Sequence, residues 1–172
     1  MRALLFDLGD TIMQEATEEK DETRTTLRAE LFPGMAEALR ELHHRGHPLA
    51  LVADTRPGTY RNVLRQHGLT ELFSAFAISE ELGVEKPHPL MFRHALASLG
   101  LPPGEAARAA MVGNNLARDI RGANALGLLS IWLHWNERHP TVPAGPEEQP
   151  RHAVGSAEEL LRLIAELEGA GE

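Results

Sequence analysis

The sequence contains no cysteine, so disulfides and thiolate metal sites are excluded. It also lacks an excess of positive charge, because 25 Asp and Glu residues oppose 17 Lys and Arg residues, giving a formal net charge of -8. That balance disfavours electrostatic attraction to nucleic acid or to an anionic membrane. We therefore expect neither nucleic acid nor a membrane as a partner.

Long apolar runs are missing as well. The run Ala3–Phe6 is followed at once by Asp7 and is too short for a signal peptide. The longest apolar region, Ala123–Trp135, is shorter than the roughly 20 residues that span a membrane. A chain of 172 residues, of which 42% are hydrophobic, can bury a substantial core. We expect a single domain over residues 1–172, located in the cytoplasm.

Lysine is scarce in this chain. Lys20 and Lys86 are the only two lysines, against fifteen arginines. A compact ammonium and a broad planar guanidinium are not interchangeable in a tight site. Each remaining lysine is therefore of interest as a candidate functional residue.

Short apolar runs alternate with helical patterns along the chain. Apolar residues recur every three or four positions in the helical stretches, glycines follow four of them, and Ser156 is the expected N-cap of the last. This alternation predicts an α/β fold class with a parallel sheet of about five strands, covered by helices on both faces. The expected strands are Ala3–Phe6, Pro48–Ala53, Ala75–Ser79, Ala109–Gly113 and Leu129–His134. The expected helices are Met35–Arg45, Thr59–His67, Pro89–Leu99, Leu116–Leu126 and the C-terminal helix at 157–168.

Two stretches break the alternation. Gln14–Thr26 is polar, with five acids against Lys20 and Arg24, and predicts a loosely packed flap or minimal cap region over residues 14–32. Residues 138–151 are rich in Pro and Gly and predict an irregular connection.

Polar residues gather where the predicted strands end. Because ligands bind at the carboxyl ends of parallel strands, we expect these residues at one edge of the sheet. Carboxylate and carbonyl oxygens suit a divalent cation, and a lysine suits a phosphoryl group. The residues concerned are Asp7, Gly9, Asp10, Thr11, Asp54, Thr55, Lys86, Asn114, Asn115 and Asp119.

Each of these residues also has a simpler interpretation. Asp10 and Thr11 could shape a turn, and either Asn114 or Asn115 is expected to cap the helix that follows. Asp119 could be a solvated helix residue paired with an arginine. The histidines of HHRGH, which begins at His43, are interpreted as positive charge near a helix end rather than as a zinc site.

The order FDLGDT, VEKPHP and VGNNLARDI resembles the haloacid dehalogenase (HAD) superfamily over nearly the whole chain. The resemblance implies a Rossmann-like three-layer sandwich. Only about 35 residues separate Thr11 from the second strand, so no separate cap domain is expected there.

The resemblance also implies roles for particular residues. It makes Asp7 the nucleophile that forms an aspartyl-phosphate, and makes Lys86 a catalytic residue that also binds the substrate phosphate. It implies a Mg²⁺ cofactor held by Asp7, the Gly9 carbonyl, Asn114 and Asp119.

Three positions depart from the family's phosphatase pattern. Gly9 stands where phosphatases carry an acid that protonates the leaving group, and Ala53 stands where they carry a phosphate-binding hydroxyl. Asp54 or Thr55 is the expected replacement for that hydroxyl as a substrate-binding residue. Asn114 replaces an acid and is a weaker ligand for Mg²⁺.

Three functions follow from this mixture. The first is a Mg²⁺-dependent phosphatase, of reduced activity toward poor leaving groups, that acts on a phosphorylated small molecule or macromolecule. A second copy of the chain in a homo-oligomer could serve as a lid. The alternative is a catalytically degenerate protein that binds a phosphorylated ligand or a protein partner. The third, a metal-independent dehalogenase, ranks last because that chemistry needs a cap that excludes water.

Overall fold

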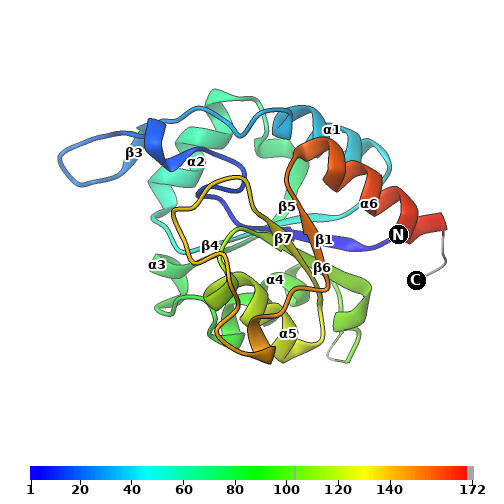
Figure 1. The fold of residues 1–172 in the computed structure, drawn as a ribbon. Helices are drawn as coiled ribbons and strands as arrows, with labels where there is room; N and C mark the ends of the chain where they lie inside the picture. Colours follow the sequence, from blue (N-terminus) through cyan, green and yellow to red (C-terminus); the bar gives the residue numbers. More distant parts are fainter. Residues whose placement is uncertain (103, 170–172) are drawn as a thin grey trace.

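Six parallel strands form one sheet in the order β5–β4–β1–β6–β7–β8. The computed structural model describes residues 1–102 and 104–169. The predicted α/β fold is confirmed (Figure 1). The strands are β1 (Ala3–Phe6), β4 (Leu49–Ala53), β5 (Phe73–Ile78), β6 (Ala109–Gly113), β7 (Leu129–Leu133) and β8 (His152–Val154).

Helices cover both faces of the sheet, which gives three layers (Figure 1). One face carries α1 (Met35–His44), α2 (Pro57–Gln66) and α6 (Ala157–Gly169). The other carries α3 (Ser79–Leu82), α4 (Pro89–Ser98) and α5 (Arg121–Leu126). Short 3₁₀ turns lie at Glu15–Thr17, Thr70–Leu72, Ala106–Arg108 and Pro146–Glu148, and a π-helical turn at Leu116–Ile120 leads into α5. No helix within 1–102 and 104–169 is long and apolar enough to cross a membrane.

The strands alternate their side chains between two apolar cores. On β1, Leu4 and Phe6 join the core under α1, α2 and α6, whereas Leu5 joins the core under α4 and α5. All three side chains are fully buried. A strand buried on both faces reads as a continuous apolar run, which is why β1 and β6 could be located from the sequence to the residue.

The sixth strand, β8, was not predicted from the sequence. Strand β8 has only three residues and follows the Pro-rich connection, so it carries little periodic signal. It pairs in parallel with β7, with Ile131 opposite His152. Ser156 does cap the helix that follows, because its Oγ accepts a hydrogen bond of 3.1 Å from the backbone N–H of Glu159.

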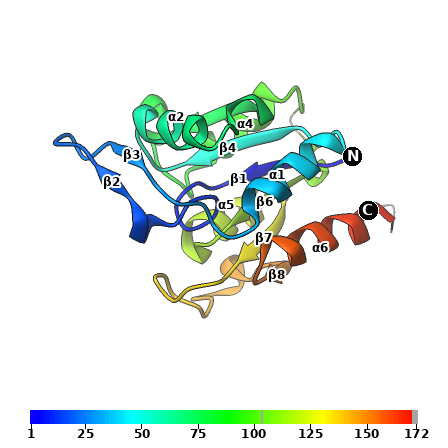
Figure 2. The ribbon, with the colours of Figure 1, turned by 90° about the horizontal axis from the view of Figure 1, so that it is seen from above.

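The polar stretch after β1 folds into a small antiparallel hairpin of β2 (Glu19–Lys20) and β3 (Thr26–Arg28). Figure 2 shows the hairpin projecting beyond the sheet on the side of α2. Its base is docked on α2, since Asn62 Nδ2 donates to the Thr26 carbonyl at 2.9 Å, whereas residues 19–24 at its tip are exposed. The described residues between Thr11 and β4 contain no helical cap domain. The looseness expected of residues 14–26 stays a prediction.

Candidate active site

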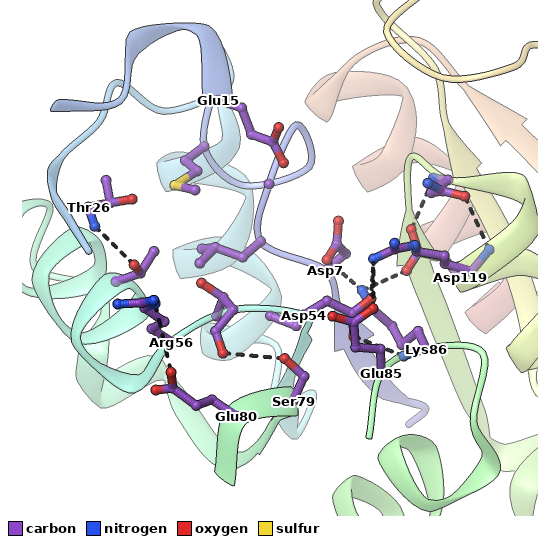
Figure 3. Close-up of a pocket in the computed structure, with 18 of the residues that line it drawn as sticks. Asp7, Glu15, Thr26, Asp54, Arg56, Ser79, Glu80, Glu85, Lys86 and Asp119 are labelled. Carbon is purple, nitrogen blue, oxygen red and sulfur yellow. Dashed lines mark hydrogen bonds and ion pairs between the residues drawn. The ribbon is translucent and has the colours of Figure 1, made fainter. Parts of the chain in front are cut away.

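A cleft of about 910 Å³ opens at the carboxyl edge of the sheet. Its floor is formed where β1, β4 and β6 end, and the hairpin forms one wall (Figure 3). Both acidic and basic side chains line it. The polar lining residues include Asp7, Glu15, Glu18, Lys20, Arg24, Asp54, Thr55, Arg56, Glu80, Glu85, Lys86, Asn114, Arg118, Asp119 and His139.

Lys86 lies at the centre of the floor. Its Nζ donates to Asp7 Oδ1 at 2.5 Å and to Asp119 Oδ1 at 2.8 Å, joining the ends of β1 and the π-helical turn (Figure 3). Thr11 Oγ1 donates to the other oxygen of Asp7 at 3.2 Å. The side chain of Lys86 is 2% exposed and that of Asp119 is 1% exposed, so this ion pair is shielded from water. The structure thus gathers Asp7, Lys86 and Asp119 from three distant parts of the sequence.

Burial sets the protonation behaviour of this trio. Burial opposes the charged form of Lys86, but the nearby carboxylates of Asp119 and Asp7 outweigh it and raise the pKa of Lys86. Burial also raises the pKa of Asp119 to about 7, against the opposing pull of Lys86, and Asp7 raises it further. Two buried carboxylates therefore share one ammonium, and the trio carries a net negative charge when both are ionised.

The carboxylate of Asp119 packs directly against Gly113, the last residue of β6. A Cβ on Gly113 would lie 2.3 Å from the Asp119 carboxyl carbon. The carboxylate cannot move aside cheaply, because Oδ1 is bonded to Lys86 and Oδ2 accepts from the backbone N–H of Asn115 at 3.0 Å.

Gly113→Ala is therefore expected to displace Asp119 and break its bond to Lys86. We expect a loss of stability of about 2–4 kcal/mol, within the range for overpacking and for a damaged buried ion pair. Urea unfolding would measure it. Gly83→Ala is a matched control, because a Cβ there meets open space, although its left-handed backbone would add a small strain. Equal midpoints for the two variants would contradict this packing argument.

The two asparagines that follow β6 have different surroundings. Asn115 is the helix cap, since its Oδ1 accepts from the backbone N–H of Arg118 at 3.1 Å. Asn114 is buried, and its Nδ2 has no hydrogen-bond partner within the described part of the chain. A buried side-chain N–H donor left unpaired at the cleft needs an acceptor, which a bound ligand would supply.

The two residues that follow β4, Asp54 and Thr55, differ in their contacts. Asp54 accepts the backbone N–H of Lys86 on Oδ1 at 2.9 Å, and its Oδ2 pairs with Arg118 at 3.0 Å. It therefore fixes the segment that carries Lys86. Thr55 lines the cleft beside it. Arg118, which was not predicted as a site residue, brings a partly exposed guanidinium to the rim.

The loop after β1 places Glu15, which was also not predicted as a site residue, in the cleft. Asp10, in a left-handed turn with φ of 49°, accepts the backbone N–H of Glu15 at 3.0 Å. Burial raises the pKa of Glu15, and the nearby carboxylates of Asp10 and Asp7 raise it further against the opposing effect of Arg138. The Glu15 side chain borders the cleft on the Asp7 side (Figure 3).

The donor set can be compared with the needs of Mg²⁺. Within residues 1–102 and 104–169, no group of three or more His, Asp or Glu side chains is placed to hold a metal ion. The cleft does offer the carboxylates of Asp7 and Asp119 and the side-chain amide of Asn114, whose oxygen is the atom that a cation would bind. Hard cations accept amide and carbonyl oxygens as well as carboxylates. The residues therefore fit a hard divalent cation, with one fewer anionic ligand than three carboxylates would give.

Comparison with known proteins gives a consistent result. A family model described as haloacid dehalogenase-like hydrolase matches residues 3–127. The phosphoserine phosphatase of Thermus thermophilus is 38% identical over 138 residues, which cover 80% of this chain and 53% of that protein. The glyceraldehyde 3-phosphate phosphatase of Methanopyrus kandleri is 32% identical over 136 residues, covering 79% and 57%. The chain spans about half the length of the curated relatives it matches.

Two solved structures match over nearly their whole length. A HAD phosphatase from Thermococcus onnurineus superposes with a TM-score of 0.74 at 21% identity, covering 95% of this chain and 98% of that one. A dehalogenase superposes with a TM-score of 0.79 at 16% identity, covering 96% and 97%. At such identities the likeness supports the fold alone.

Proposed function

Because the chain belongs to the haloacid dehalogenase-like hydrolases, we propose that it is a phosphatase that acts through an aspartyl-phosphate on Asp7. The observation that carries this proposal is the buried contact of Lys86 with both Asp7 and Asp119 at the floor of an open cleft. The names of the relatives, phosphatases of small phosphorylated molecules, support a substrate of the same class.

The residues on the floor of the cleft have different roles in the proposed reaction. Thr11 and Lys86 hold the two oxygens of Asp7, so the carboxylate is oriented before a substrate arrives. Attack of an Asp7 oxygen on phosphorus forms a new P–O bond and breaks the bond to the leaving oxygen. The Lys86 ammonium offsets the negative charge of the transferring phosphoryl group. Thr55 is proposed to donate to a phosphate oxygen, and the contacts of Asp54 favour a positioning role beside the substrate-binding role expected from the sequence.

We propose that Mg²⁺ is held by Asp7, Asp119, the Asn114 side chain and the Gly9 carbonyl. When bound, the ion supplies positive charge to the phosphoryl oxygens. The uncharged Asn114 implies weak binding.

The experiment that tests this function measures hydrolysis of p-nitrophenyl phosphate with Mg²⁺ and with EDTA. We expect activity with Mg²⁺, at least about tenfold less with EDTA, and recovery on adding Mg²⁺. Asn114→Asp should lower the Mg²⁺ concentration that gives half activity by about tenfold or more, because it adds an anionic ligand.

An unchanged Mg²⁺ requirement in a folded Asn114→Asp variant would count against the assigned ligand set. Absence of hydrolysis by the wild type, with or without metal, would favour the alternative of a protein that binds a phosphorylated ligand or a protein partner. The observation that favours this alternative is the departure from the phosphatase pattern at Gly9, Ala53 and Asn114. The cytoplasmic location and a homo-oligomeric state stay predictions.

A further inference from the structure

The space beside Gly9 is occupied by another residue's carboxylate. A Cβ on Gly9 would lie 2.1 Å from Oε1 of Glu15 and 3.0 Å from its carboxyl carbon. An aspartate's carboxylate oxygens lie about 2.4 Å from its own Cβ, by standard bond lengths. The Glu15 oxygen is therefore as close to that Cβ position as the carboxylate oxygen of an aspartate at position 9 would be.

The backbone does not explain why residue 9 is a glycine. Gly9 is not among the described glycines with a positive φ, so a side chain could be carried there without strain in the main chain. A side chain at position 9 would have no room, because the Glu15 carboxylate occupies that space. The glycine at position 9 is therefore what allows the Glu15 carboxylate to lie there.

Glu15 is fixed from two sides. Its backbone N–H donates to Asp10, and its Oε2 pairs with Arg138 Nη2 at 2.9 Å. The same Arg138 lies 2.9 Å from Asp10 Oδ2 through Nε, so the arginine ties both acids to the loop after β7. This arrangement holds Oε2 at the arginine and leaves Oε1 directed at the space beside Gly9. Asp10 is turned away from the cleft and does not line it.

We propose that Glu15 is the acid–base residue of the reaction, supplying the carboxylate that position 9 lacks. The proposal rests on the proposed phosphatase function. In the first step an Asp7 oxygen bonds to phosphorus, the bond from phosphorus to the leaving oxygen breaks, and its electron pair stays on that oxygen. The proton of the Glu15 carboxylic acid moves to the leaving oxygen, which departs as an alcohol, and Glu15 becomes a carboxylate.

In the second step the roles reverse. Glu15 takes a proton from water as the water oxygen bonds to the phosphorus of the aspartyl-phosphate. The bond between phosphorus and the Asp7 oxygen breaks, which returns the Asp7 carboxylate and releases inorganic phosphate. Glu15 ends as the acid, so atoms and charge balance over the cycle.

The test compares two aryl phosphates of nearly the same shape. p-Nitrophenolate departs without a proton, whereas the more basic phenolate of phenyl phosphate needs one. Glu15→Gln should lower kcat/KM for phenyl phosphate by about 10²-fold or more and for p-nitrophenyl phosphate by less than about tenfold. Glu19→Gln, on the exposed β2 strand of the same hairpin, is the matched control and should leave both values unchanged.

A second variant moves the carboxylate from one residue to the other. Gly9→Asp combined with Glu15→Ala removes the obstructing side chain and places an acid on residue 9 itself. We expect it to recover phenyl phosphate hydrolysis to within about tenfold of the wild type. Gly9→Asp alone crowds two carboxylates into one space and should not raise phenyl phosphate hydrolysis above the wild-type value.

The outcomes separate the two proposals. If the wild type hydrolyses both esters and folded Glu15→Gln lowers both by the same factor, or neither, Glu15 is only structural and this inference fails while the phosphatase stands. If Glu15→Gln unfolds, the transplanted variant decides, and failure of a folded transplant to act on phenyl phosphate overturns the inference. If the wild type hydrolyses neither ester and matches Asp7→Asn, the proposed function fails and Glu15 has no reaction to serve.

Discussion

Asp7→Asn is expected to lower kcat for any phosphate ester by at least about 10³-fold, because an amide oxygen is a far poorer nucleophile than a carboxylate oxygen. The substitution keeps the shape of the side chain and its contact with Thr11. It should not destabilise the fold, since it removes one of the two carboxylates that share the Lys86 ammonium. Steady-state hydrolysis of p-nitrophenyl phosphate at saturating Mg²⁺ measures the effect.

Two controls keep this result interpretable. Urea unfolding should give a free energy for Asp7→Asn equal to or above that of the wild type. Asp21→Asn changes an acid in the exposed turn of the hairpin and should leave kcat unchanged. Retention of more than about a tenth of wild-type activity in Asp7→Asn would remove Asp7 from the reaction.

Lys86→Met is expected to cause the largest loss of stability of any single change at the site. It leaves the buried carboxylates of Asp7 and Asp119 without a cation, and breaking a buried pair in this way costs about 3–5 kcal/mol. Urea unfolding of the metal-free protein in EDTA would measure it. The loss should be greater at pH 8 than at pH 6. Burial raises the pKa of Asp119 to about 7 although Lys86 lowers it, so removing Lys86 raises this pKa further. At pH 6 the folded variant can therefore protonate Asp119 and neutralise one buried charge, whereas the unfolded chain, with an ordinary aspartate pKa, takes up no proton. At pH 8 less of this relief is available, and the loss of stability is greater.

A double variant isolates the cause of this loss. Lys86→Met combined with Asp119→Asn removes one of the two stranded charges, so it should be more stable at pH 8 than Lys86→Met alone. An equal unfolding free energy for the two variants would show that the lost alkyl packing of Lys86, rather than uncompensated charge, accounts for the effect.

The layers of the fold could be predicted because they depend on local patterns. Strands β1 and β6 are continuous apolar runs, and each was located to the residue. The predicted helix Leu116–Leu126 is in fact a π-helical turn followed by α5, a distinction that apolar spacing does not make. Strand β8 was missed because three residues are too few to show a period of two.

Only some of the site residues could be predicted from the sequence in this way. Residues directly at strand ends, such as Asp7 after β1 and Asn114 after β6, share an edge by topology alone. Glu15 gave no such signal, because it is one of five acids in a polar stretch. Its place beside Gly9 depends on the left-handed turn at Asp10 and on Arg138, more than a hundred residues away in the chain. Such a contact becomes visible only in three dimensions.

Covalent transfer of the phosphoryl group to Asp7 can be detected by rapid acid quenching followed by mass spectrometry. Enzyme mixed with excess p-nitrophenyl phosphate and Mg²⁺ should yield a peptide containing Asp7 that carries one phosphoryl group, absent from Asp7→Asn. Glu15→Gln should raise the trapped fraction, since its breakdown loses the base that activates water. Steady hydrolysis with no labelled peptide, or with the label on another residue, would show that Asp7 is not the nucleophile.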